Sequence, residues 1–142
     1  MENKTVCHFL LDTVHNNPNG QSVFFKSGRQ WNSLTWKEYF KKVELIAGAL
    51  KTLGVEQGQR VAIYANSRPE WAMTDMAVLG VGAFTIPIYQ SSLPEDMEFI
   101  LNNSETSILV CETTALFEKY ETIAAQCPNV NVVIVMEGPS NP

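Results

Sequence analysis

The spacing of hydrophobic residues near the start of the chain predicts a helix followed by a β-hairpin. Apolar side chains lie three and four residues apart within residues 8–14, and the polar run NNPNG at 16–20 ends that pattern. The runs SVFFK at 22–26 and RQWNSL at 29–34 are rich in β-branched and aromatic residues, and a Ser-Gly pair follows the first of them. We therefore predict a short N-terminal helix and then a β-hairpin.

A long helix is predicted to begin next. Thr35 and Glu38 have the spacing of a capping box, in which each side chain accepts a hydrogen bond from the other residue's backbone. Gly54 supplies the left-handed residue that ends the helix. The apolar residues between these ends share one helix face: Phe40, Val43, Ile46, Ala47, Leu50 and Leu53.

A short pattern, S-x-P-E, occurs twice and marks two further helix starts. It follows RVAIYA (60–65) at 67–70 and FTIPIY (84–89) at 92–95, and both preceding runs have the length and composition of buried strands. Proline suits the first helical turn, and glutamate complements the positive end of the helix dipole. The capping residue stays open, because the serine and the residue before proline both qualify: Ser67 or Arg68, and Ser92 or Leu93.

The rest of the chain continues this alternation. A helix after Glu95 leads to the strand SILVC at 107–111, and a helix from Thr113 to Cys127 leads to the strand VNVVIVM at 130–136. Alternating helices and strands are typical of parallel sheets. The predicted fold class is α/β: a three-layer, mostly parallel sheet with helices on both faces, preceded by the N-terminal helix and hairpin. We predict one domain over residues 1–142, with a polar exit or linker at 137–142.

Composition and charge narrow the range of partners. The 142 residues are 45% hydrophobic and 18% charged, as in an ordinary globular domain with its own core. The net charge of −5 argues against nucleic acid and against a polybasic membrane patch. We predict neither a signal peptide at the N-terminus nor a membrane span in the uncharged stretch 76–94. Cys7, Cys111 and Cys127 are odd in number and widely spaced, which favours a reducing, cytoplasmic setting over disulfides or zinc.

A search for chemistry along the chain yields no catalytic, cofactor-binding or metal-binding residue. The glycine-rich Rossmann and P-loop patterns are absent, and Gly80-Val81-Gly82 lies at the end of a helix rather than between a strand and a helix, which makes it a helix stop. His8 and His15 lack a third metal ligand. The carboxylates at 95, 96 and 98 are explained by the helix dipole, and the serines at 67, 91 and 92 lack a histidine partner in a plausible triad order.

Two features of the sequence suggest a role in binding. The predicted helix 69–82 is apolar around most of its circumference, so either the hairpin and N-terminal helix cover it or it docks against protein outside the chain. Tyr89, Gln90 and Ser91 follow the carboxyl end of a strand, which is where parallel α/β sheets usually bind ligands. We take these three residues as candidate substrate contacts, with a plain connecting loop as the alternative.

The order of several motifs resembles a known family. TWKEY at 35–39, LGVEQGQRVAI at 53–63, NSRPEW at 66–71 and GAFTIPIY at 82–89 together resemble the N-terminal portion of the adenylate-forming (AMP-binding) superfamily. Within it, the resemblance is to the long-chain fatty acid CoA ligases, and it runs from about residue 31 to residue 136. Each motif is weak alone, and their order and spacing make the resemblance specific.

The resemblance implies a function for a longer protein. Members of the family activate a fatty acid with ATP and Mg²⁺, and then transfer the acyl group from the adenylate to coenzyme A. Their phosphate-binding loop, magnesium-binding glutamate and catalytic lysine have no counterpart in this chain. The resemblance therefore implies the first subdomain of a cytoplasmic ligase, inactive as this fragment, whose partners are the remainder of the ligase chain and, in the full-length enzyme, a fatty acid. A peripheral membrane location of the full-length enzyme is compatible with it.

Two other functions stay open from the sequence. A free-standing, non-enzymatic domain would bind a small ligand or a partner at the carboxyl edge of its sheet. An oligomerisation module would form homo-oligomers, because a fragment that exposes the predicted apolar helix containing Trp71 would tend to self-associate.

Overall fold

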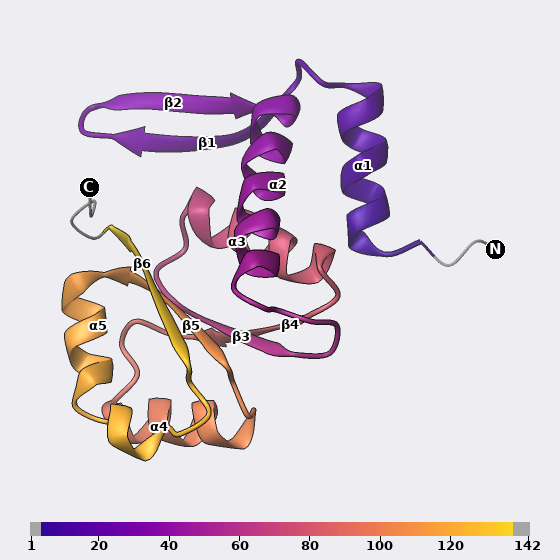
Figure 1. Cartoon of the computed structure of the whole chain (residues 1–142). Coiled ribbons are helices and arrows are strands. Elements are labelled where there is room, and N and C mark those ends of the chain that lie inside the picture. Colours follow the sequence, from indigo (N-terminus) through magenta and orange to yellow (C-terminus); the bar gives the residue numbers. More distant parts are fainter. Residues whose placement is uncertain (1–3, 138–142) are drawn as a thin grey trace.

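The computed structural model describes residues 4–137 and arranges them around one parallel sheet (Figure 1). Helices and strands alternate along the chain in this order: α1 (Val6–Asn16), β1 (Gln21–Ser27), β2 (Gln30–Thr35), α2 (Trp36–Thr52), β3 (Arg60–Tyr64), α3 (Pro69–Gly80), β4 (Phe84–Ile88), α4 (Pro94–Asn103), β5 (Ile108–Thr113), α5 (Thr114–Glu121), the 3-10 helix η1 (Ala124–Gln126) and β6 (Val132–Glu137).

The parallel sheet has the strand order β4-β3-β5-β6, with β3 and β5 in the middle. Ala62 of β3 lies opposite Ile86 of β4 and Leu109 of β5, and Val132 of β6 lies opposite Ile108 of β5. β1 and β2 form a separate antiparallel hairpin. The α/β class, the parallel sheet and the preceding helix and hairpin are therefore confirmed.

Helices cover both faces of the sheet, so the domain has three layers. On one face, side chains of α1, α2, α3 and the hairpin pack over Val61, Ile108 and Val110. On the other face, α4 and α5 pack over Ala62 and Leu109. Coverage on both sides explains the continuous apolar run of β3, in which each residue from Val61 to Tyr64 has an exposed fraction of 0%.

The helix starts follow the local rules read from the sequence. The capping box of α2 is confirmed, since the Glu38 backbone N–H donates to Thr35 Oγ1 (3.3 Å) and the Thr35 backbone N–H donates to Glu38 Oε2 (2.8 Å). α3 and α4 begin with proline in the first turn, as predicted. Arg68 and Leu93, rather than the preceding serines, occupy the capping positions, and neither makes a side-chain capping bond.

We expect Thr35→Ala to destabilise the domain by about 1 kcal/mol, because it removes the oxygen that satisfies an orphan N–H at the start of α2. Urea unfolding followed by circular dichroism measures the change. Thr52→Ala is a matched control in the last turn of the same helix, where the hydroxyl donates to the Gly48 carbonyl. An equal effect of both substitutions would contradict the capping explanation.

α3 is covered from within the chain. Its buried residues are Met73, Thr74, Ala77 and Val78, and it contacts α1, α2, β3 and β4. Gly80 is the one residue of α3 that is exposed. Neighbouring elements of the same chain therefore cover α3, which explains why this helix is apolar around most of its circumference.

Three boundaries differ from the sequence prediction. α3 ends at Gly80, and Gly82 takes the left-handed conformation (φ 81°) in the turn that follows. The predicted helix up to residue 127 breaks after Glu121, where the Thr122 hydroxyl donates to the Lys119 carbonyl (2.7 Å), and η1 follows. Of the predicted polar exit, Glu137 is the last residue of β6, and residues 138–142 lie outside the described residues.

Candidate functional site

The loops at the carboxyl edge of the sheet enclose a hollow, which we call the edge hollow. The loop after β4 contributes the three predicted residues, Tyr89, Gln90 and Ser91. The hollow has a volume of about 430 cubic ångströms. Its other lining residues come from the loop after β3, the start of α3 and the end of β4: Ala65, Asn66, Ser67, Trp71, Pro87 and Ile88. The structure thus brings the predicted residues together with side chains that sequence reasoning did not assign to a site.

The lining of the edge hollow is aromatic and polar, and none of its side chains is charged. The Tyr89 side chain is 82% exposed, while the backbone of its loop is held in place. The Ser92 backbone N–H donates to the Tyr89 carbonyl (2.9 Å), and the buried Tyr64 hydroxyl donates to the Gln90 carbonyl (3.4 Å). Such a surface offers stacking and neutral hydrogen bonds to a ligand.

A group of charged side chains beside the edge hollow, which we call the Arg68 cluster, ties three strand ends together. Arg68 Nε donates to Glu70 Oε2 (2.7 Å), and Arg68 Nη1 donates to Glu112 Oε1 of β5 (3.1 Å) and to Glu137 Oε1 of β6. The second oxygen of Glu112 accepts from the backbone N–H (2.7 Å) and the side-chain amide (2.9 Å) of Asn66. The loop after β3 is therefore fixed to the ends of β5 and β6.

These contacts shift the ionisation of the cluster. Burial acts to raise the pKa of Glu112, but hydrogen bonds from Asn66 and the charge of Arg68 outweigh it and hold that pKa below its ordinary value. The pKa of Glu70 is lowered by Arg68 against the same effect of burial. The hydrogen bond to Glu70, followed by that to Glu137, raises the pKa of Arg68. The cluster is thus an ionised network at neutral pH, and its role at this edge is to position the loop.

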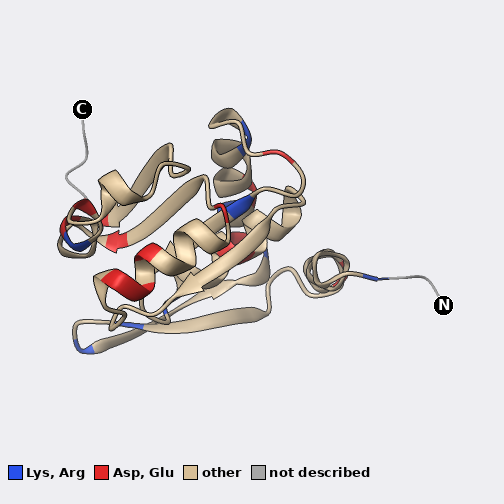
Figure 2. Ribbon diagram, turned by 90° about the horizontal axis from the view of Figure 1, so that it is seen from below, with Lys and Arg blue, Asp and Glu red and all other residues tan. Residues whose placement is uncertain are grey.

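Other candidates from the sequence have local explanations. His8 Nδ1 accepts from the backbone N–H of Thr5 (3.1 Å) and so completes the cap of α1. Glu95 and Asp96 lie in the first turn of α4. Within residues 4–137, no group of three or more histidine, cysteine or acidic side chains has the arrangement of a metal site, and no helix combines the length and hydropathy of a membrane span. Basic residues are scattered over the described elements (Figure 2).

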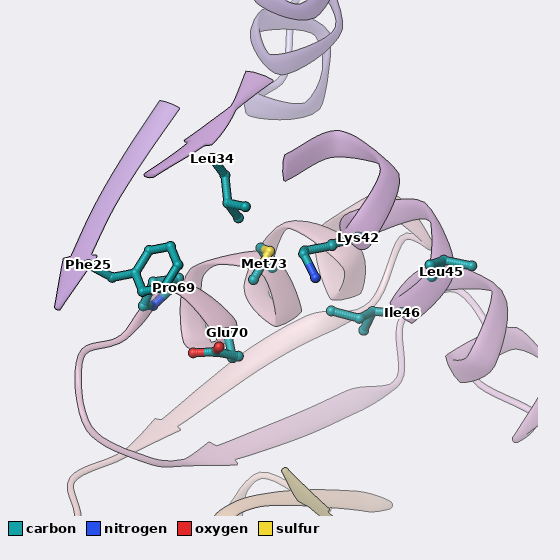
Figure 3. A pocket seen from close by; sticks show the side chains of 8 residues that line it. All are labelled: Phe25, Leu34, Lys42, Leu45, Ile46, Pro69, Glu70 and Met73. Atoms are coloured by element: carbon teal, nitrogen blue, oxygen red, sulfur yellow. The ribbon is translucent and has the colours of Figure 1, made fainter. Parts of the chain in front are cut away.

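A second hollow, with a volume of about 360 cubic ångströms, lies between the hairpin, α2 and α3 (Figure 3). We call it the hairpin hollow. Sequence reasoning missed it, because three separate segments supply its lining: Phe25, Leu34, Lys42, Leu45, Ile46, Pro69, Glu70 and Met73. Glu70 is held by Arg68, so the hairpin hollow and the Arg68 cluster share a wall.

The chain is thus a three-layer α/β domain with a hollow among the loops at the carboxyl edge of its parallel sheet. A protein-family model described as "AMP-binding enzyme" matches residues 10–142, and the chain belongs to this family.

Named relatives agree with this assignment. The long-chain-fatty-acid–CoA ligase FadD15 of Mycobacterium bovis is 34% identical over 108 residues, which are 76% of this chain and 18% of that protein. The long-chain-fatty-acid–CoA ligase ACSBG2 of Xenopus laevis is 25% identical over 130 residues, which are 92% of this chain and 18% of that protein. The chain thus spans about a fifth of the length of these curated relatives.

A solved structure shows the same fold. The long-chain-fatty-acid–CoA ligase FadD1 from Archaeoglobus fulgidus superposes with a TM-score of 0.85 over 97% of this chain and 28% of that chain, at 23% sequence identity. The described elements therefore correspond to a part of a larger chain in that structure.

Proposed function

We propose that this chain is the first N-terminal subdomain of an ATP-dependent long-chain fatty acid CoA ligase, and that it is inactive by itself. The observation that carries the proposal is the family match over residues 10–142, joined to relatives that are named as such ligases and of which the matched segment is 18%. The reaction would form an acyl-adenylate and pyrophosphate from a fatty acid and ATP, and then a thioester with coenzyme A. Its partner would be the remainder of the ligase chain, in the cytoplasm.

In this proposal the chain contributes part of the scaffold of the enzyme, and the catalytic residues lie in the remainder of the ligase. ATP, Mg²⁺ and coenzyme A would be held by the rest of the enzyme, since the resemblance places the phosphate-binding loop, the magnesium-binding glutamate and the catalytic lysine outside this chain. Tyr89, Gln90 and Ser91 would contribute one wall of a substrate site. Their place at the carboxyl edge, the exposed Tyr89 ring and the neighbouring Trp71 support this assignment.

The test is an exchange of segments. Replacing the matched 108-residue segment of the M. bovis relative with that of this chain is expected to give a ligase that makes acyl-CoA from palmitate, ATP and coenzyme A. The isolated chain is expected to show no turnover in the same assay. Turnover by the isolated chain would contradict its inactivity, and a folded chimera that forms no acyl-adenylate would contradict the subdomain assignment.

A variant of this chimera tests the substrate wall. Tyr89→Ala is expected to raise KM several-fold with little change in kcat, because the ring makes a contact that substrate and transition state share. The melting temperature should stay the same, since the Tyr89 side chain is 82% exposed. Phe99→Ala, at a similarly exposed aromatic (69%) on α4, is the control and should leave KM unchanged.

A second candidate function, an oligomerisation module, is favoured by exposed aromatic side chains on the hairpin. Phe24 is 63% exposed and Trp31 is 70% exposed. In the ligase proposal these side chains would meet the rest of the enzyme instead. Fusion of this chain to a monomeric reporter separates the two functions, because an oligomerisation module would make the reporter oligomeric.

A further inference from the structure

The Asn66 side chain belongs both to the edge hollow and to the Arg68 cluster. It lines the edge hollow together with Tyr89, Gln90 and Ser91, and it also lines a hollow of about 500 cubic ångströms beside the Arg68 cluster. Asn66 therefore stands between a charged surface and the edge hollow, whose lining carries no charged side chain. The hydrogen bonds of its amide decide which end of the amide faces each side.

Glu112 determines the orientation of this amide. Glu112 Oε2 accepts from the Asn66 backbone N–H (2.7 Å) and from Asn66 Nδ2 (2.9 Å), and Glu112 Oε1 accepts from Arg68 Nη1 (3.1 Å). The Glu112 carboxylate is ionised at neutral pH, so it can only accept hydrogen bonds. The nitrogen end of the Asn66 amide, and not its oxygen, must therefore face Glu112.

This orientation leaves the Asn66 oxygen available to a ligand. The two ends of a planar amide point in different directions, so Asn66 Oδ1 is turned away from Glu112. Within residues 4–137 no donor pairs with Asn66 Oδ1, and the Asn66 side chain is exposed, whereas that of Glu112 is 13% exposed. The loop after β3 thus presents a fixed hydrogen-bond acceptor whose holder is largely covered.

The charges beside Asn66 disfavour an anionic group at this oxygen. In the hollow beside the Arg68 cluster, the lining includes three carboxylates and two cations: Glu70, Glu112, Glu137, Lys26 and Arg68. Negative charge therefore predominates behind Asn66. An ionised carboxylate also has no donor to offer to a carbonyl oxygen. The group that matches Asn66 Oδ1 is accordingly neutral and carries an N–H or O–H.

We propose that Asn66 is a specificity-determining residue of the edge hollow, and that its Oδ1 accepts a hydrogen bond from a neutral N–H or O–H group of a substrate. Glu112 does not line the edge hollow and is a positioning residue, because it acts by holding the amide of Asn66.

This inference rests on the proposed ligase function and narrows it. An ionised fatty acid has no hydrogen-bond donor, whereas ATP and coenzyme A carry amino, amide or hydroxyl groups. The rest of the enzyme would hold the phosphates and the reacting groups of these two substrates. The wall at Asn66 would contact one neutral group of one of them.

Asn66→Ala in the active chimera tests the acceptor. The KM for either ATP or coenzyme A should rise about threefold to tenfold, because one neutral hydrogen bond is lost in ground state and transition state alike. The value of kcat and the KM for palmitate should change little. Steady-state kinetics with one substrate varied at a time identifies which substrate donates. Unchanged KM values for all three substrates, or a rise for palmitate alone, would overturn the proposal.

Two substitutions of Glu112 test the positioning role. Glu112→Ala should raise the same KM as Asn66→Ala, since the amide loses the acceptor that orients it. Glu112→Gln retains an oxygen for Asn66, because Arg68 keeps Glu70 and Glu137 as partners, so its KM should lie closer to the wild-type value. Destabilisation alone would reduce the folded fraction, and hence the apparent kcat, without this change in KM. A wild-type KM in Glu112→Ala would contradict the positioning role.

Asn102→Ala is the matched control. The Asn102 side-chain amide donates to the Gln126 carbonyl (2.9 Å), and Asn102 does not line the edge hollow. The loss of a structural amide at this position should leave every KM unchanged. An equal rise in KM for Asn102→Ala and Asn66→Ala would overturn the assignment of Asn66 to a substrate contact.

A measurement on the chain itself tests the positioning step without the ligase. NMR relaxation should show a rigid Asn66 side-chain amide in the wild type, a mobile one in Glu112→Ala and a rigid one in Glu112→Gln. A mobile amide in the wild type would overturn the inference even with an active chimera. A rigid amide together with a folded, inactive chimera would instead contradict the ligase proposal.

Discussion

Arg68→Ala is expected to lower the free energy of unfolding by about 2–3 kcal/mol, because it leaves the carboxylates of Glu70, Glu112 and Glu137 without their shared cation. The Glu112 side chain is 13% exposed, so water replaces the lost hydrogen bond poorly. Glu70 and Glu137 are about half exposed and contribute less. Chemical denaturation near neutral pH measures the change.

The pH dependence of the same variant separates charge from packing. The folded pKa of Glu112 lies below its ordinary value of 4.5, so its contribution to stability is complete above that value and is lost as the pH falls through the folded pKa. The wild type should therefore lose stability on acidification below about pH 4.5. Arg68→Ala should lose less, since the hydrogen bonds from Asn66 alone remain to lower this pKa.

Arg60→Ala is the control for this experiment. Its guanidinium lies 3.8 Å from an exposed carboxylate of Glu105 and makes a typical surface ion pair. We expect a change of no more than about 0.5 kcal/mol. Equal effects at Arg60 and Arg68, or identical acid profiles of wild type and Arg68→Ala, would contradict the role assigned to the Arg68 cluster.

Leu109→Ala is expected to cost about 3 kcal/mol, because the side chain is 0% exposed and the substitution leaves a cavity between β5 and the helices α4 and α5. This cost is a large part of the stability of a domain of this size. The melting temperature should fall by about 10 °C. Thermal unfolding followed by circular dichroism measures it.

Leu45→Ala makes the same chemical change at a position that is 67% exposed on α2. We expect an effect within about 0.5 kcal/mol there. Comparable losses at Leu109 and Leu45 would mean that the α4 and α5 side of the sheet is not a packed core.

The fold was predictable because its signals are local. The spacing of apolar residues, the capping box at Thr35 and the prolines at 69 and 94 each act within a few residues, and the structure confirms the elements that they predict. The break of α5 was missed, since a hydroxyl at Thr122 competes for a helical carbonyl without changing the apolar pattern.

The candidate site was predictable in part. The general rule for parallel sheets leads to Tyr89, Gln90 and Ser91 at the carboxyl edge, and their role as substrate contacts stays a prediction. The Arg68 cluster was missed, because Arg68 lies 44 residues from Glu112 and 69 residues from Glu137 along the chain. Spacing within one sequence does not reveal such pairs. The signal available in the sequence was the position of Arg68, which lies between a predicted buried strand and the proline that begins the next helix.

The strand order β4-β3-β5-β6 also has a consequence for synthesis on the ribosome. β3 is the first strand of the sheet to leave the exit tunnel, and its residues from Val61 to Tyr64 are completely covered in the finished domain. Its partner β5 follows more than forty residues later, as the register of Ala62 with Leu109 shows. The nascent chain is therefore most prone to aggregate after β3 has emerged and before β5 has emerged. During this interval the apolar strand β3 lacks one of its two neighbouring strands.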